Sequence, residues 1–189
     1  MRFLSIVLIL GWALLLTGCV GLSDYKLYRT NHTSAYSNHN FAHFNQNNDL
    51  LTVIHGNPTD APKAKFDEAV TSAMQGRNAH GRTNFTTTPN ETNDPRTKFV
   101  IQFNPSISKT ARDLCIKETP LPTGQPVAGK ITMIMAYCVN SRYLAYTFGE
   151  TAQPNSPNDP AFAAMIGGAV QKLIPLADPD RGSICRRNC

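Results

Sequence analysis

Catalytic signatures are absent from this sequence of 189 residues. It contains no G-x-S-x-G, H-E-x-x-H or P-loop pattern, the patterns that position a nucleophile, a zinc ion or a phosphate. Its 13 acidic residues are scattered, and the adjacent Asp67 and Glu68 fit the solvent face of a helix. Thr86, Thr87 and Thr88 fit an extended β-branched stretch better than a set of nucleophiles. We therefore predict a protein that is not an enzyme and that holds no metal or cofactor.

A strong charge of either sign is also missing. Charged side chains make up 16% of the residues, and the formal net charge is +5. Arginines gather only near the end, at Arg181, Arg186 and Arg187. A basic stripe interleaved with aromatic residues, the usual sign of a nucleic-acid interface, is not present. We expect no nucleic-acid partner, and the mild positive charge fits either a plain solvated surface or contact with anionic lipid.

No apolar run approaches the roughly 20 residues that span a bilayer. The longest, from Phe3 to Leu16, has about 14 residues and follows the single charge of Arg2. The run then ends in small residues. A charged start, a short apolar core and a small-residue exit are typical of a secretory signal peptide. We expect residues 1–18 to be such a signal rather than a transmembrane helix.

The four residues Leu16-Thr17-Gly18-Cys19 close this run. They resemble a bacterial lipobox, whose cysteine receives a diacylglycerol on its sulfur and usually an acyl chain on its new amino group. The resemblance implies cleavage between Gly18 and Cys19 and lipidation of Cys19. Two or three acyl chains anchor a protein stably, whereas one holds it only marginally. Val20 stands where an aspartate often marks inner-membrane retention, so the expected location is the outer membrane, facing the periplasm.

Four further cysteines are Cys115, Cys138, Cys185 and Cys189. An even number in an exported chain predicts disulfides. Sequence distance favours the pairs Cys115–Cys138 and Cys185–Cys189 among the three possible pairings. Metal binding and reactive-thiol chemistry are the alternatives, but the spacing matches no common zinc site and neither pair has the C-x-x-C form.

Residues 19–48 are expected to form a lipidated N-terminus and a tether. Asparagine is abundant there and hydrophobic periodicity is weak, a composition that buries little apolar surface. His39 and His43 are four residues apart, as in some helical zinc sites, but no third ligand is placed by the sequence. The domain proper is expected over 49–176, followed by a tail, 177–189, with two cysteines and the three clustered arginines.

Hydrophobic patterns divide 49–176 into strands and helices. Strands are predicted over 50–55, 83–88, 97–103, 130–138 and 142–148, the last two as a hairpin. Helices are predicted over about 62–75 and between the Asp159-Pro160 cap and Pro175, and a short helix fits 107–116. The predicted fold is an α/β two-layer sandwich, with a mixed sheet of about four to five strands and two main helices on one face.

The stretches VIHGNP (53–58), FDEAV (66–70), FTTTP (85–89) and FVIQFNP (99–105) precede the cysteines at 115 and 138. This pattern resembles a group of bacterial lipoproteins without an assigned activity. The likeness covers most of 50–174, and it implies no activity for this chain. The layout is also similar to small periplasmic α/β domains of envelope lipoproteins, which is an analogy of architecture alone.

Two loops, Gly56-Asn57-Pro58 and Asn104-Pro105, each follow a predicted strand. If those strands are parallel, both loops lie at the sheet edge where ligands of α/β proteins tend to bind. His55, Asn57 and Asn104 would then line a small polar cleft. Ordinary turn chemistry is the alternative explanation of these residues.

These observations predict a membrane-anchored, non-catalytic binding or assembly module of the cell envelope. Its expected partners are the membrane, through the N-terminal lipid, and an envelope protein. A passive structural lipoprotein is the main alternative, and a small periplasmic enzyme is a weaker one. Neither the identity of the partner nor the oligomeric state follows from the sequence.

Overall fold

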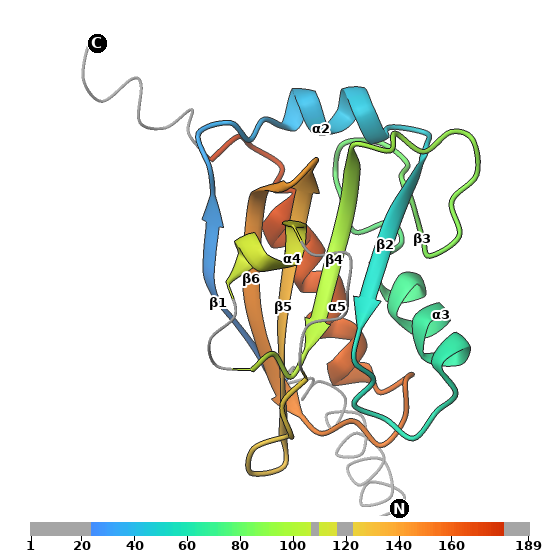
Figure 1. The fold of residues 1–189 in the computed structure, drawn as a ribbon, viewed down its shortest axis with the longest axis vertical. Helices are drawn as coiled ribbons and strands as arrows, with labels where there is room; N and C mark the ends of the chain where they lie inside the picture. The colour runs from blue at the N-terminus through green and yellow to red at the C-terminus, as the bar shows by residue number, and fades with distance from the viewer. Residues whose placement is uncertain (1–23, 107–109, 117–122, 180–189) are drawn as a thin grey trace, which may run out of the picture.

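A computed structural model describes residues 24–106, 110–116 and 123–179. They form one mixed six-stranded sheet, in the order β1-β6-β5-β4-β2-β3, with four helices packed against it (Figure 1). The strands are β1 (Tyr25–His32), β2 (Asp49–His55), β3 (Asn84–Thr86), β4 (Thr97–Phe103), β5 (Lys130–Val139) and β6 (Arg142–Ala152). The helices are α2 (Asn38–Asn45), α3 (Lys63–Met74), α4 (Ala111–Ile116) and α5 (Pro160–Leu173). The predicted α/β class is confirmed, while β1 and α2 were not expected.

The centre of the sheet combines both strand directions. β2 runs parallel to its neighbours β3 and β4, and every other neighbouring pair is antiparallel. The parallel part is the crossover that the sequence predicted, since α3 connects β2 to the strands beside it. β5 and β6 form the predicted hairpin, whose turn contains Asn140 at φ 54°. The strand ends of β2 and β4 therefore meet at one edge.

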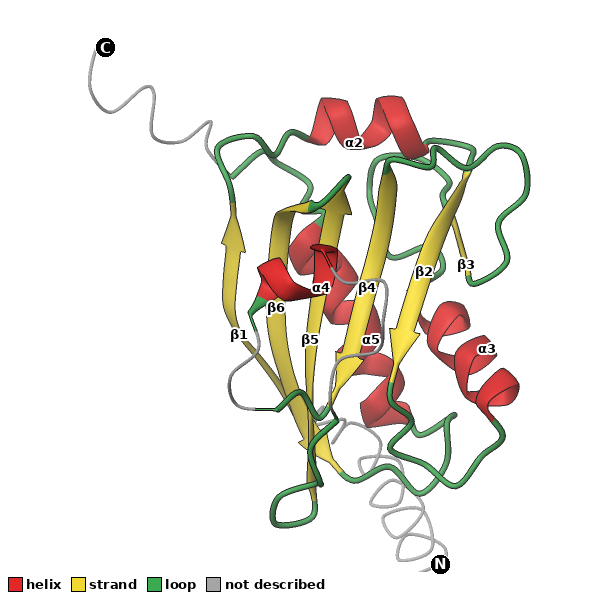
Figure 2. Cartoon of the chain, viewed as in Figure 1, coloured by secondary structure: helices red, strands yellow, loops and turns green. Residues whose placement is uncertain are grey.

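The main core lies on the face of the sheet covered by α3 and α5 (Figure 2). Phe99, Ile101 and Phe103 alternate along β4 and are fully buried in this core. Both helices therefore pack on the same face, as the apolar stripes of the sequence predicted. Gly167 lets the two helices approach closely, because a Cβ built there would lie 3.1 Å from the carbonyl oxygen of Ala73.

Among the described elements, α4 covers the opposite face and stands in front of the sheet in Figure 2. A second, smaller core forms there from the outward positions of β4 and β5 and from Ala111 and Leu114 of the helix. Cys115 forms a disulfide with Cys138, the pairing that sequence distance favoured. Because Cys138 belongs to β5, this bond ties the short helix to the middle of the sheet.

The prediction that residues 25–48 belong to a tether is wrong. β1 pairs antiparallel with β6, from Tyr25 opposite Thr151 to His32 opposite Ala145. α2 lies across the ends of the strands and buries Phe41 completely (Figure 1). The weak periodicity of this stretch reflects an edge strand with many exposed positions and a helix of two turns, neither of which needs a long apolar pattern.

One buried asparagine shows why an asparagine-rich stretch folds here. The side chain of Asn45 donates to the Tyr137 hydroxyl (3.1 Å) and accepts from the Thr97 hydroxyl (2.9 Å), while its carbonyl accepts from Thr83 (3.0 Å). Hydrogen bonds thus replace apolar contacts as the link between α2 and the sheet. The link also extends beyond the expected boundary at 176, because Asp178 accepts from the backbone N–H of Asn38 (2.6 Å).

No helix in the described ranges combines the length and apolar character needed to cross a bilayer. Gly18 and Cys19, with the predicted cleavage and lipid, lie outside the described residues, as do Cys185 and Cys189 with their predicted disulfide.

Candidate functional site

The predicted edge exists, but both of its asparagine side chains already form hydrogen bonds within the fold. β2 and β4 are parallel, with His55 opposite Gln102. The Asn57 side-chain oxygen accepts from the N–H (2.9 Å) and hydroxyl (2.8 Å) of Thr59. The Asn104 side-chain oxygen accepts from the N–H of Thr132 (3.0 Å), and its own N–H donates to the Thr132 carbonyl (2.8 Å). Asn57 closes its own turn and Asn104 ties the end of β4 to β5, so the hypothesis of a polar cleft here gains no direct support.

His55 and Gln102 form the buried part of this edge. Burial lowers the pKa of His55, and the positive charges of Lys63 and Lys98 lower it further. Gln102 is fully buried, and its side-chain nitrogen donates to the Phe103 carbonyl (3.0 Å). Its side-chain oxygen accepts no hydrogen bond within the part of the chain that the structure describes. The sequence pattern did not single out Gln102.

A row of aromatic rings lies on the face of the sheet that α4 covers, along β6 and the neighbouring edge strand β1. Tyr28 stacks on Phe148 with ring centroids 5.7 Å apart. Tyr146 meets Phe148 edge-on at 5.9 Å and Tyr143 edge-on at 5.3 Å. The rings are half-buried, and Tyr28 is 37% exposed. Offset and edge-to-face pairs of this kind fix the rings relative to one another.

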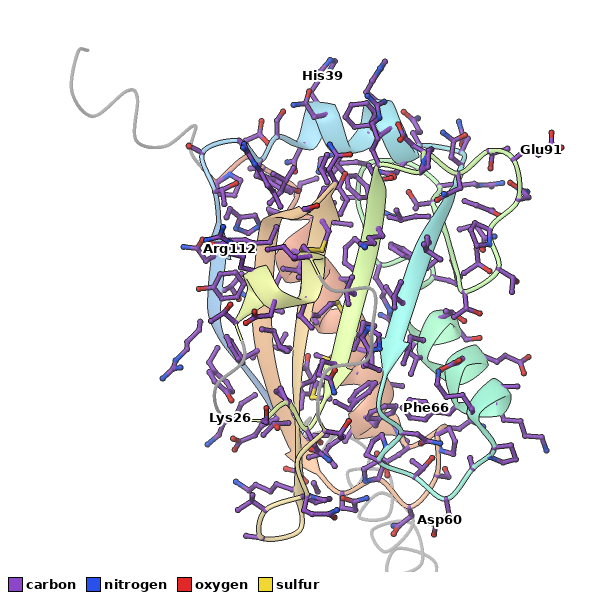
Figure 3. The ribbon with its side chains drawn as sticks, in the orientation of Figure 1. Lys26, His39, Asp60, Phe66, Glu91 and Arg112 are labelled. Carbon is purple, nitrogen blue, oxygen red and sulfur yellow. A yellow bond between two sulfur atoms is a disulfide. The ribbon has the colours of Figure 1, made fainter. Side chains whose placement is uncertain are left out.

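Three arginines border the aromatic row. The Arg29 guanidinium carbon lies 5.9 Å from the centre of the Phe148 ring, a cation–π arrangement. Arg112 projects from α4, as Figure 3 shows, and Arg142 begins β6. The ion pairs among the described residues are Lys63–Asp67, Asp94–Arg96 and Lys130–Glu150. None of them involves these arginines, and all three are exposed. We name Tyr28, Tyr143, Tyr146 and Phe148 with Arg29, Arg112 and Arg142 the aromatic–arginine face.

Two adjoining hollows follow this face. One, of about 430 Å³, is lined by Arg29, Thr110, Ala111, Arg112, Tyr143, Tyr146 and Phe148. The other, of about 400 Å³, is lined by Thr33, Arg112, Ile116, Ser141, Arg142 and Tyr143. They share Arg112 and Tyr143, and no acidic side chain is among the described residues that line them. The surface therefore offers ring faces, hydroxyl groups and positive charge to one ligand.

Two irregularities in the strands build this face. In β6, Tyr143 lies opposite Cys138 and Ala145 lies opposite Tyr137, so Leu144 is an extra residue. Without it, strict alternation would place Tyr143 and Tyr146 on opposite faces of the sheet. The run RYLAYTF contains a signal for this, because its aromatic residues at 143, 146 and 148 do not share one alternation.

The second irregularity is in β1, where the pairing with β6 shifts between Tyr28 and Asn31. Arg29 lies in this shift with φ 51°, in the left-handed region that a side chain disfavours. A strained residue of this kind in an exposed strand points to a functional position. No composition or periodicity in the sequence indicated it.

A further hollow, of about 520 Å³, lies between α2 and the turn of the β5–β6 hairpin. Phe44, Tyr137 and Arg142 are among its lining residues. Burial raises the pKa of Tyr137 to about 12, so its phenol is neutral, and its hydroxyl is already bonded to Asn45. Arg142 connects this hollow to the aromatic–arginine face.

The described residues contain no group of three or more histidine, cysteine or acidic side chains placed to hold a metal ion. His39 and His43 lie on α2, and both are exposed.

No family model matches the sequence, and no curated protein matches it. Among solved structures, the fold is similar to a dodecamer of PelC from Paraburkholderia phytofirmans, with 12% sequence identity and a TM-score of 0.42 over 79% of this chain and 97% of PelC. A dodecamer of a point variant of the same protein gives 11% identity and a TM-score of 0.42, over 81% of this chain and 99% of the other. Structures this different share at most a general arrangement of elements, and a common function does not follow.

Proposed function

We propose that this protein is a lipid-anchored binding module of the bacterial cell envelope and that it is not an enzyme. In this proposal Cys19 carries the lipid, and Val20 directs the protein to the outer membrane, facing the periplasm. The signal-like segment 1–18 supports the export of the chain. The Cys115–Cys138 disulfide supports an oxidising compartment such as the periplasm. The resemblance to bacterial lipoproteins without an assigned activity agrees with this location.

The aromatic–arginine face is the proposed binding surface, and its partner is an acidic segment of another envelope protein. The observation that carries this proposal is the row of rings beside Arg29, Arg112 and Arg142, none of which takes part in an ion pair within the described part of the chain. Tyrosine and arginine are enriched where protein partners bind most strongly. Arginine binds carboxylates through two parallel hydrogen bonds, which favours aspartate and glutamate side chains in the partner.

The face is also rigid, which favours recognition. Three of its four rings stand on β6, and the disulfide to β5 holds the helix that carries Arg112. The start of that helix is closed by Asp113, which accepts from the N–H (3.0 Å) and the hydroxyl (2.9 Å) of Thr110. A preformed surface loses little conformational entropy when a partner binds.

Site-specific crosslinking in intact bacteria tests the proposal. A photoreactive aromatic amino acid replaces Tyr146 in the hollow, and in a control chain it replaces Lys65, an exposed residue of α3 beside the other face of the sheet. We expect one recurrent adduct from position 146, mapping to an acidic segment, and no such adduct from position 65. The double substitution Arg29→Glu and Arg112→Glu should abolish the adduct, whereas Lys65→Glu should leave it unchanged.

The outcomes separate the candidate functions. Failure to form an adduct from position 146 would favour a passive structural lipoprotein. An adduct that survives the reversal of both arginines would remove charge recognition from the proposal. The anchor is tested independently: labelled palmitate should enter the wild-type chain and not the Cys19→Ala variant, and membrane fractionation should place the label in the outer membrane.

A further inference from the structure

A second surface concerns the membrane itself, and the argument rests on the proposed lipid on Cys19. Cys19 is five residues before Asp24, the first described residue. A fully extended chain covers at most about 3.6 Å per residue, so this connection spans no more than about 18 Å. Because residues 25–48 belong to the folded domain, the anchor holds the domain close to the lipid instead of on a long leash.

The short connection also determines which end of the molecule lies near the membrane. β1 begins at that end, together with the start of β5 and the end of β6 (Figure 1). The pairing Tyr25–Thr151 and Lys130–Ala152 places these strand ends side by side. The Thr151 hydroxyl donates to the carbonyl of Asp24 (3.1 Å), which fixes the point where the connection begins. α2 lies at the far end of the sheet.

The most prominent feature at this end is the turn at Val127–Lys130, which projects beyond the sheet in Figure 1. The N–H of Lys130 donates to the carbonyl of Val127 (3.1 Å), and both central residues have positive φ, Ala128 at 53° and Gly129 at 70°. This is the tight type I′ geometry of a hairpin. It holds the Val127 side chain in solvent, where it is 77% exposed, beside exposed Pro126.

The charges of the strand ends beside this turn are nearly balanced. Lys130 is paired with Glu150 (3.0 Å), and exposed Lys26 lies near exposed Asp24, its second neighbour in the chain. Figure 3 shows Lys26 toward this end and His39 at the other. A balanced charge does not require an anionic lipid, so the apolar tip is the feature that suits a bilayer. Transfer of a solvent-exposed valine side chain into the apolar region beneath the headgroups lowers the free energy of the system.

We infer that the turn 126–129, led by Val127, inserts into the surface of the same bilayer leaflet that holds the lipid anchor. The domain then has two attachment points, the acyl chains and the tip, and stands with α2 directed away from the membrane. The aromatic–arginine face, which runs along the side of the sheet, remains accessible to a partner beside the domain. This orientation is a property of the mature, lipidated chain.

The mature chain contains no tryptophan, because the single one, Trp12, lies in the signal. Val127→Trp therefore introduces a unique fluorophore at the tip, and His39→Trp introduces a matched one on exposed α2. Each full chain is produced in a bacterium and purified with its lipid, and the mass of its N-terminal peptide confirms acylation of Cys19. The proteins are then placed in phosphatidylcholine vesicles whose acyl chains carry bromine, which quenches tryptophan in the bilayer.

We expect loss of fluorescence and a blue shift for V127W, and neither change for H39W. In the unmodified chain, paramagnetic lipid should broaden the methyl NMR signals of Val127, which excludes an effect of the added ring. An acylated V127W protein that is not quenched would overturn the inference while leaving the anchor intact. Equal quenching of both variants would overturn it as well, since the domain would then have no fixed orientation. A Cys19 without lipid would overturn both the anchor and the inference.

Discussion

Tyr143 and Tyr146 lie on the same face of β6, with ring centroids 5.3 Å apart, although strict strand alternation would separate them. The extra residue Leu144 brings them together, because it shifts the pairing with β5 between Tyr137 and Cys138. Bulges are frequent next to functional sites, where they redirect a side chain. The aromatic–arginine face thus depends on a local defect in the ladder as much as on its residue types.

Substitution of Arg29 by glycine should separate stability from binding. Arg29 has φ 51°, where a side chain costs about 1–2 kcal/mol and glycine costs nothing. Glycine also makes the unfolded chain more flexible, at about 0.5–1 kcal/mol, so the expected net gain in the free energy of unfolding is about 0.5 kcal/mol. The crosslinked adduct should become weaker, because the guanidinium over Phe148 is lost. Urea denaturation and crosslinking measure the two effects.

Arg29→Ala is the matched control for this prediction. It removes the same charge but keeps a Cβ at the positive φ, so it should weaken the adduct equally without raising stability. A glycine variant less stable than the alanine variant would show that Arg29 is not strained.

Removal of the Cys115–Cys138 disulfide should destabilise the domain and loosen α4. The two cysteines are 23 residues apart. Closing a loop of that size lowers the conformational entropy of the unfolded chain and thereby stabilises the folded state by about 3 kcal/mol. We expect Cys115→Ala with Cys138→Ala to lower the free energy of unfolding by about this amount and to reduce crosslinking at position 146, since α4 carries Arg112. Reduction of the wild type should have the same effects. Unchanged stability in the double variant would mean that the second core alone holds α4.

Sequence patterns predicted the central part of this fold well. The strand at 97–103 and both long helices occur where alternation and the i, i+3, i+4 spacing placed them. These elements bury a continuous apolar stripe, for example Phe66 and Val70 of α3. Such a stripe can be recognised in the sequence without knowledge of the element against which it packs. The pairing of Cys115 with Cys138 could be chosen for a similar reason, since it joins neighbouring segments.

The rest of the fold depends on contacts that no local pattern records. β1 is an edge strand with few buried positions, and α2 is held by the hydrogen bonds of Asn45 with Tyr137 and Thr97, far away in sequence. The candidate site was missed for the same reason. Arg29, Arg112 and Tyr146 come from three separate elements, Arg29 lies within the irregularity of β1, and Tyr143 joins Tyr146 on one face only through the irregularity of β6.

Gly167 should tolerate alanine but not leucine. A Cβ there lies 3.1 Å from the Ala73 carbonyl oxygen and 2.7 Å from the side-chain Nε of Arg77, which can move aside. Alanine gains about 1 kcal/mol of helix propensity against this tight contact, so its net effect should be small. Leucine would force α3 and α5 apart and should destabilise by about 1–3 kcal/mol, measured as a lower thermal midpoint. Equal midpoints for both variants would contradict the close packing of these helices.

Because of His55, the free energy of unfolding should decrease as the pH is lowered below about 6.5. Burial, with the charges of Lys63 and Lys98, lowers the pKa of this imidazole below its ordinary value of about 6.5, so the unfolded chain takes up the proton at a higher pH than the folded chain does. Between the folded pKa and about 6.5, the unfolded state binds more protons, and the free energy of unfolding therefore decreases as the pH is lowered through this window. Above it, both states are neutral at His55 and the contribution is constant. Urea denaturation between about pH 7 and pH 5 should give a shallower slope for His55→Gln than for the wild type. Identical slopes for His55→Gln and the wild type would show that other groups cause the pH dependence.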